Sequence, residues 1–281
     1  MSKTLTQPLK WHGGKKYLAP KIVALMPKHL HYVEPYFGGG AVLLERDPND
    51  KSLWLSEKAG SNGVSEVVGD IYGDLINFWR VLRCKELFQE FARAVQTTPM
   101  ARAEFDLASE PVDAADPVML AWSFFVRARQ SRAGTFKGFT TLTRNRTRRG
   151  VNGNVSEWIG AVDGLAAIHA RLQPVIIENI PALDLICRED TPHTLFYLDP
   201  PYLHETRAAK AAYAHEMGKA DHADLLRLIG GVKGKVMLSG YRSDLYDAAL
   251  AGWTRHEFDI ANHAAGGNGK RRMVECLWCN F

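Results

Sequence analysis

The chain has 281 residues, 46% of them hydrophobic, which predicts a globular protein with a substantial buried core, built as one large domain or as one domain with a smaller insertion. No stretch approaches the ~18 apolar residues of a membrane span, and the polar first nine residues lack the apolar core of a signal peptide, so a cytoplasmic location is expected. The formal net charge of +4 is too small to identify a partner, so the clustering of the cations matters more than their sum.

Short apolar runs that end at polar, Gly or Pro residues alternate with helical periodicity along the chain. The runs predict buried parallel strands whose carboxyl ends carry function. The strands are expected at residues 31–33, 66–68, 175–177, 195–198 and 235–238. The helices are expected at residues 41–46, 75–83 and 221–229. For the last helix, Asp221 is the expected N-cap and Gly230 the expected stop. This alternation predicts an α/β fold.

The middle third of the chain has a different pattern. Between about residues 85 and 172 the strand patterns vanish, and helical periodicity continues beside a long basic loop. We therefore expect an inserted, mainly helical subdomain at 84–172, with the main domain formed by residues 1–83 and 173–281.

A strand that runs into a glycine-rich turn and a helix is expected at residues 33–42, VEPYFGGGAV. Glycines let the backbone approach a ligand closely, as in nucleotide-binding turns. The stretch matches neither the phosphate loop nor GxGxxG, and a tight turn without a ligand explains it about as well. Asp70, at the end of the next strand, stands where acidic residues take ribose hydroxyls, which favours an adenosine-containing cofactor.

The strand at 195–198 ends in Asp199-Pro200-Pro201-Tyr202. Two consecutive prolines contribute carbonyls but no N–H donors, so beside the Asp199 carboxylate they leave a site rich in hydrogen-bond acceptors. An exocyclic NH2 group offers two donors to such a site, and the Tyr202 ring can stack on an extruded base. The alternative is a strand end and turn capped by Asp199, which the whole tetrad makes the weaker interpretation.

An unbalanced basic run spans residues 127–149, where Phe136 and Phe139 interleave with the cations and no acidic residue occurs. It predicts contact with a phosphate backbone, although a disordered basic loop without a ligand is the alternative. The cations of the run are Arg127, Arg129, Arg132, Lys137, Arg144, Arg146, Arg148 and Arg149. A second basic loop near the C-terminus carries Lys270, Arg271 and Arg272. It is expected to contact the same phosphate backbone.

Four scattered cysteines predict reduced thiols, and no metal site is expected. Cys276 and Cys279 form a CxxC pair, but they lie in a predicted closing strand at 274–279. No second pair at zinc spacing accompanies them.

The sequence resembles the Dam-type DNA adenine methyltransferases. The resemblance rests on KWHGGK (10–15), VEPYFGGGAV (33–42), VVGD (67–70) and FYLDPPY (196–202), in that order, and continues through Ser239-Gly240-Tyr241 to the C-terminal strands, as in phage-borne members. It covers nearly the whole chain except the centre. It implies a Rossmann-like, S-adenosylmethionine-dependent methyltransferase fold whose inserted subdomain recognises the DNA target.

The resemblance also implies roles for particular residues. Asp199, Pro200 and Tyr202 would hold the target adenine of double-stranded DNA and activate its amine. The residues implied to contact or line the S-adenosylmethionine pocket are Trp11, Lys15, Glu34, Tyr36, Gly38, Gly40, Asp70 and Asp199. The departures from the family pattern are Tyr36 for a usual Phe, Gly69 for a frequent Asn, His12 for a small residue, and an apparent extra hairpin at 49–64.

Other interpretations stay open from the sequence. They are methylation of the cytosine amine, an RNA substrate, methylation of a protein glutamine, and a catalytically silent DNA-binding module. Asp at position 199, rather than Ser or Asn, favours adenine. A monomer or weak dimer is expected, with a role in restriction-modification, phage anti-restriction or replication control.

Overall fold

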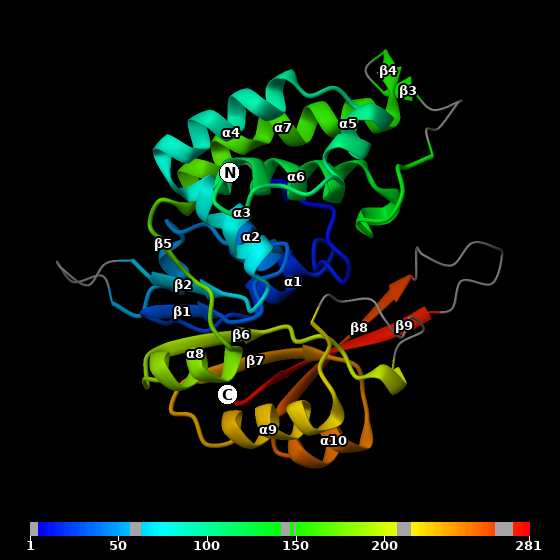
Figure 1. The fold of residues 1–281 in the computed structure, drawn as a ribbon. Coiled ribbons are helices and arrows are strands. Elements are labelled where there is room, and N and C mark those ends of the chain that lie inside the picture. The colour runs from blue at the N-terminus through cyan, green and yellow to red at the C-terminus, as the bar shows by residue number, and fades with distance from the viewer. Residues whose placement is uncertain (1–4, 57–62, 142–146, 149, 207–214, 262–271) are drawn as a thin grey trace. The chain divides into compact units, whose positions relative to one another are not determined.

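The computed structural model describes residues 5–56, 63–141, 147–148, 150–206, 215–261 and 272–281 (Figure 1). The chain divides into two compact units. Unit 1 comprises Met1–Met26, Gly38–Asp50 and Tyr72–Asn179, and unit 2 comprises Pro27–Phe37, Lys51–Ile71 and Ile180–Phe281.

Helices and strands alternate at both ends of the chain, as the sequence predicts. The α-helices are α1 (Ala19–Ala24), α2 (Ala41–Glu45), α3 (Gly73–Arg83), α4 (Lys85–Thr97), α5 (Arg102–Leu107), α6 (Pro117–Gln130), α7 (Gly153–Leu172), α8 (Ala182–Glu189), α9 (Lys219–Ile229) and α10 (Asp244–Ala249). The strands are β1 (His31–Glu34), β2 (Ser65–Gly69), β3 (Thr147–Arg148), β4 (Val151–Asn152), β5 (Val175–Glu178), β6 (Thr194–Leu198), β7 (Lys235–Gly240), β8 (Thr254–Ala261) and β9 (Arg272–Cys279). Short 3-10 turns lie at Lys51–Leu53, Arg132–Gly134 and His204–Thr206.

A seven-stranded sheet has the order β5-β2-β1-β6-β7-β9-β8. β1 pairs in parallel with β2 and β6, and β6 pairs in parallel with β7. The closing strand β9 runs antiparallel to both β7 and β8. The predicted α/β, Rossmann-like architecture is therefore confirmed, including the closing strand.

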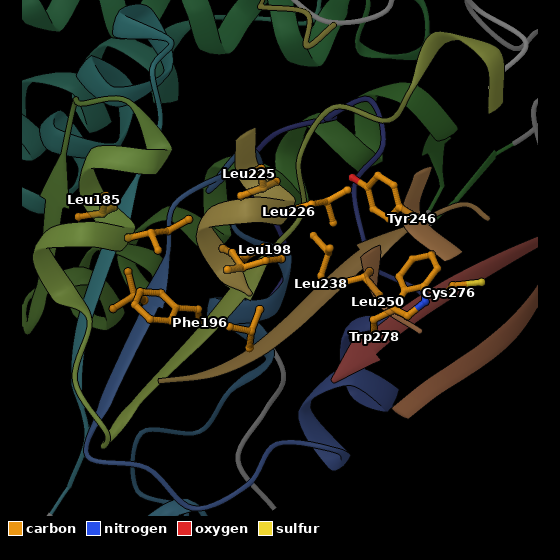
Figure 2. Close-up of a cluster of buried hydrophobic side chains, with 14 of the residues drawn as sticks. Leu185, Phe196, Leu198, Leu225, Leu226, Leu238, Tyr246, Leu250, Cys276 and Trp278 are labelled. Atoms are coloured by element: carbon orange, nitrogen blue, oxygen red, sulfur yellow. The ribbon is translucent and has the colours of Figure 1, made fainter. Parts of the chain in front are cut away.

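The core of unit 2 lies between the strands and helices α8, α9 and α10, which cover one side of β6 and β7 (Figure 1). Phe196 and Leu198 of β6, Leu225 and Leu226 of α9 and Trp278 of β9 belong to one buried cluster, drawn in Figure 2. All five residues of β6 are buried, as expected for a central strand of a parallel sheet. This packing fixes the carboxyl end of β6, where the Asp-Pro-Pro-Tyr tetrad begins.

The predicted strand at 175–177 differs from the expectation of burial. β5 lies at the edge of the sheet, and Ile176 is 46% exposed. An apolar run does not tell an edge strand from a central one, since the difference depends on how many neighbours the strand acquires.

Unit 1 is mainly helical and confirms the expected helical character of the middle third. Its helices α3, α4, α6 and α7 pack on one another. Phe78, Phe91 and Phe125 are fully buried at this junction, and the Phe78 and Phe125 rings stack at 5.9 Å. The hairpin of β3 and β4 is a feature that the periodicity did not predict. The unit also holds α2 and α3, so it is larger than the predicted insertion at 84–172.

One local prediction requires correction. Asp221 is not the N-cap of α9, because the helix begins at Lys219 and its N-cap is Gly218. The Asp221 carboxylate instead accepts a hydrogen bond from the Gly218 N–H at 2.7 Å, the return arm of a capping box. The expected stop at Gly230 is confirmed. The apparent hairpin at 49–64 contains a 3-10 turn and a parallel bridge from Trp54 to His29 in its described part, while 57–62 lie outside the described residues.

Cys276 and Cys279 are buried in β9, where burial raises the pKa of the Cys276 thiol to about 11 and that of Cys279 to about 12. Within the described residues, no three His, Cys, Asp or Glu side chains are grouped so as to hold a metal ion. Across the same part of the chain, every helix is too short or too polar to cross a membrane.

Phe78→Ala should lower the free energy of unfolding by about 3–5 kcal/mol, because it removes a fully buried ring and leaves a cavity. Leu107→Ala, at a residue 59% exposed on α5, is the control and should change stability by no more than about 0.5 kcal/mol. Denaturant unfolding of the two variants measures the difference. Equal stabilities would contradict the described core.

Candidate active site

Three acidic residues lie at the same edge of the sheet in unit 2. Glu34 ends β1, Asp70 follows β2, and Asp199 follows β6. Because these parallel strands are neighbours in the order β2-β1-β6, their carboxyl ends meet at one edge. The chain proceeds in opposite directions across the sheet from β1 and from β6, so this edge is a topological switch point, where α/β proteins bind their ligands.

The carboxylate of Glu34 is buried and accepts a hydrogen bond from the Tyr32 hydroxyl at 2.9 Å. Asp199 is partly exposed after the fully buried β6, and Pro200 behind it is buried. Neither Pro200 nor Pro201 has an N–H group that could bond the adjacent acceptors. Carboxylates therefore gather at this edge, and the two prolines add no N–H donor to it.

Tyr202 is held at three points in this edge. Its hydroxyl lies 3.2 Å from Asp199 Oδ1 and 2.5 Å from Glu275 Oε1. Its ring meets the Tyr241 ring edge to face at a centroid distance of 4.8 Å. Burial, with the charges of Asp199 and Glu275, raises the pKa of Tyr202 well above its ordinary value, so the hydroxyl remains a donor at neutral pH.

Other tyrosines near these carboxylates also stay neutral. Burial, followed by the charge of Asp199, raises the pKa of Tyr197, whose hydroxyl lies 3.0 Å from Ser239 Oγ. Burial and the charges of Asp70 and Asp221 raise the pKa of Tyr36. The hydroxyl of Tyr36 is a feature that the usual Phe would lack.

The glycine-rich turn and Trp11 lie together in unit 1. A Cβ atom on Gly38 would come within 2.7 Å of Trp11 Nε1, and one on Gly39 within 2.8 Å of Trp11 Cβ. Gly38 and Gly40 also have positive φ angles of 47° and 67°, and Gly40 is the N-cap of α2. Close approach of Trp11 and the tight turn together account for glycine at these positions.

Side chains from the segment before α1 and from α3 donate hydrogen bonds to the carbonyls of this turn. The Gln7 amide donates to the Gly39 carbonyl at 2.8 Å, and the Trp79 indole donates to the Gly38 carbonyl at 3.0 Å. Trp11 itself is only half-buried. Lys15 is buried, and its Nζ donates a hydrogen bond to the Gly13 carbonyl at 3.0 Å.

The structure separates the predicted phosphate-binding cations into different environments. Arg132, Lys137 and Arg148 are exposed, as a backbone contact requires. Arg127 is half-buried, with its guanidinium 5.8 Å from the centre of the Phe136 ring. The side chains of Arg144, Arg146, Arg149, Lys270, Arg271 and Arg272 lie outside the described residues.

Arg129 does not stand on the surface where the run placed it. It is buried on α6, and its guanidinium donates to the Glu157 carbonyl at 2.7 Å. Burial lowers the pKa of Arg129 to about 10, against the opposing charge of Glu157. The sequence does not show which face of α6 is covered, and the predicted phosphate contact of Arg129 stays a prediction.

Glu275 contacts Tyr202 although no motif singled it out, and Tyr241 stood in the resemblance without an assigned role. Glu275 is the one acidic residue in the run Val274–Cys279, and it is 6% exposed. A buried carboxylate in an apolar strand needs a polar partner, and that signal was available in the sequence. The identity of its partner, Tyr202, was not.

Two comparisons bear on this site. A family model described as "D12 class N6 adenine-specific DNA methyltransferase" matches residues 11–262, which include Trp11, the glycine turn and the Asp-Pro-Pro-Tyr tetrad. A segment of 75 residues is 39% identical to the Type II methyltransferase M1.LlaDCHI of Lactococcus lactis subsp. cremoris. That similarity covers 26% of this chain and 21% of the length of the relative.

Gly39→Ala should destabilise the protein by about 1–3 kcal/mol, because the added methyl group overlaps Trp11 Cβ. The control is Gly164→Ala in α7, where nothing lies within 4 Å of the added Cβ. It should stabilise by up to about 1 kcal/mol, as alanine is the better helix former. Chemical denaturation compares the two, and a neutral Gly39→Ala would contradict the contact with Trp11.

Proposed function

The chain belongs to the D12 class N6 adenine-specific DNA methyltransferases, and from that membership we propose that it transfers a methyl group from S-adenosylmethionine to the N6 amine of adenine in double-stranded DNA. The observation that carries the proposal is the acceptor-rich end of β6, where the Asp199 carboxylate precedes two prolines. An exocyclic amine, with two N–H donors, is the nucleophile that such an edge suits.

The described residues fit S-adenosylmethionine. Asp70 and Glu34 are acceptors at the ends of neighbouring strands, the position from which acidic residues take ribose hydroxyls. Tyr36 and Asp199 are further proposed contacts in unit 2. The contacts that the resemblance implies for Trp11, Lys15, Gly38 and Gly40, which belong to unit 1, stay predictions. When bound, the cofactor supplies an electrophilic methyl group on a sulfonium.

The residues of the protein activate the N6 amine nitrogen of adenine. The lone pair of the adenine amine is delocalised into the ring, so the amine is a poor nucleophile until its geometry changes. The Asp199 carboxylate and the Pro200 carbonyl each accept one N–H bond, which favours a pyramidal nitrogen with its lone pair directed at the methyl group. Tyr202 holds the base after it has left the duplex stack, a step that costs a few kcal/mol.

DNA is proposed as the substrate on the family membership and on the exposed cations Arg132, Lys137 and Arg148. The relative from Lactococcus is a Type II methyltransferase. We propose a modification role of that kind for this chain, which favours restriction-modification over the other roles considered. The cytoplasmic location, the phage origin and the monomeric or weakly dimeric state stay predictions.

Asp199→Ala and Asp199→Asn should each lower methyl transfer by ~10²-fold or more, since they remove the charged acceptor of the amine. The measurement is tritium transfer from labelled S-adenosylmethionine to modification-free plasmid DNA. The matched control is Asp224→Asn, an exposed carboxylate on α9 paired with Arg227. Full activity of either Asp199 variant would contradict the proposed role of Asp199 as the acceptor of the amine.

A triple variant of Arg132, Lys137 and Arg148 to Ala should reduce the salt dependence of DNA binding, by a slope of about 0.9 for each phosphate that is no longer neutralised. A variant with the same charge change on unit 2, Lys219, Arg227 and Lys233 to Ala, serves as the control. Binding titrations between low and moderate salt give both slopes. Equal slopes would exclude these three cations from the interface.

A further inference from the structure

The Tyr202 hydroxyl of the proposed active site contacts a second carboxylate besides Asp199. Glu275 Oε1 lies 2.5 Å from the hydroxyl oxygen, closer than Asp199 Oδ1 at 3.2 Å. Both Tyr202 and Glu275 are buried. Glu275 also lies beyond residues 11–262, the part of the chain that the family model matches.

The topology of the sheet brings Glu275 to this edge. β6 and β7 run in parallel, so Tyr202 and Tyr241 follow their strands at the same edge. β9 runs antiparallel to β7 with Cys276 opposite Gly240, so Glu275 is placed level with the residue after β7. The charged side chain therefore reaches the tetrad from a strand that is distant in sequence.

The phenol of Tyr202 carries one proton and faces two carboxylates. Short O–H···O contacts to an ionised oxygen are the strong ones, and 2.5 Å is at the short end of their range. The proton is therefore donated to Glu275, while the contact with Asp199 is the longer and weaker one. The raised pKa of Tyr202 agrees with this arrangement, because the hydroxyl keeps its proton at neutral pH.

We propose that Glu275 is a positioning residue for methyl transfer. By accepting the hydrogen bond of the Tyr202 hydroxyl, it fixes the ring that holds the target base. It also keeps that proton away from Asp199, so the acceptor capacity of Asp199 is directed to the amine. The inference rests on the proposed function and adds to it a residue from β9.

The test uses the full chain with modification-free plasmid DNA and tritiated S-adenosylmethionine. Glu275→Ala should lower kcat by ~10- to 100-fold, the effect of removing one charge-assisted hydrogen bond. Affinity for S-adenosylhomocysteine, measured by calorimetry, should stay within about threefold of the wild type, because Glu275 acts through Tyr202. Glu275→Gln should recover most of kcat, since its amide oxygen can accept the same hydrogen bond.

Coupling with Tyr202 separates this role from a merely structural one. Tyr202→Phe removes the hydroxyl and should lower kcat about as much as Glu275→Ala does. In the Tyr202→Phe background, Glu275→Ala should cost less than about a further twofold, since the hydrogen bond between the two side chains is already absent. The matched control is Glu257→Gln on the neighbouring strand β8, exposed and paired with Arg255, which should leave kcat unchanged.

Several outcomes overturn the inference. They are an unchanged kcat for Glu275→Ala, a Glu275→Gln variant as impaired as Glu275→Ala, or equal losses from Glu275→Ala in the two backgrounds. If thermal melting shows that Glu275→Ala does not fold, Tyr202→Phe decides, and an unchanged kcat for that folded variant overturns the inference. A wild-type protein without transfer activity would instead contradict the proposed function itself.

Discussion

The absence of backbone N–H groups at Pro200 and Pro201 is the constraint on which the site depends. A buried strand normally ends where its last carbonyls find donors, and here the next two residues have none to offer. The Asp199 carboxylate adds a charged acceptor at the same point. An edge rich in acceptors suits a ligand that brings donors, and an exocyclic amine brings two.

The residues around the tetrad fix the orientation of its acceptor groups. The core around Phe196 and Leu198 fixes β6, and with it the direction in which Asp199 leaves the sheet. Neutral tyrosines at positions 197 and 202 lie beside the Asp199 charge, and burial holds their protons in place. Glu275, from the far end of the chain, accepts the hydrogen bond of the Tyr202 hydroxyl. The active edge is thus assembled from local sequence at β6 and from long-range pairing at β9.

The features that the sequence predicted best are those determined by neighbours in the chain. A local apolar run predicts strand β6. The prolines of the tetrad predict where that strand ends, and Gly230 predicts where α9 ends. The features that it predicted poorly depend on partners far away in sequence. Arg129 lies among cations in the sequence, yet the packing of α6 buries it against Glu157. β5 is apolar but sits at an edge, and Glu275 acquires its role only when β9 pairs with β7.

The central claim is that the acceptors at the end of β6 activate the N6 amine of adenine in DNA. The most direct measurement is mass spectrometry of nucleosides from modification-free DNA that has been incubated with the protein and isotopically labelled S-adenosylmethionine. The account predicts labelled N6-methyladenine. Label found only in N4-methylcytosine would keep the amine chemistry but contradict the choice of base, and label in 5-methylcytosine would contradict the account altogether.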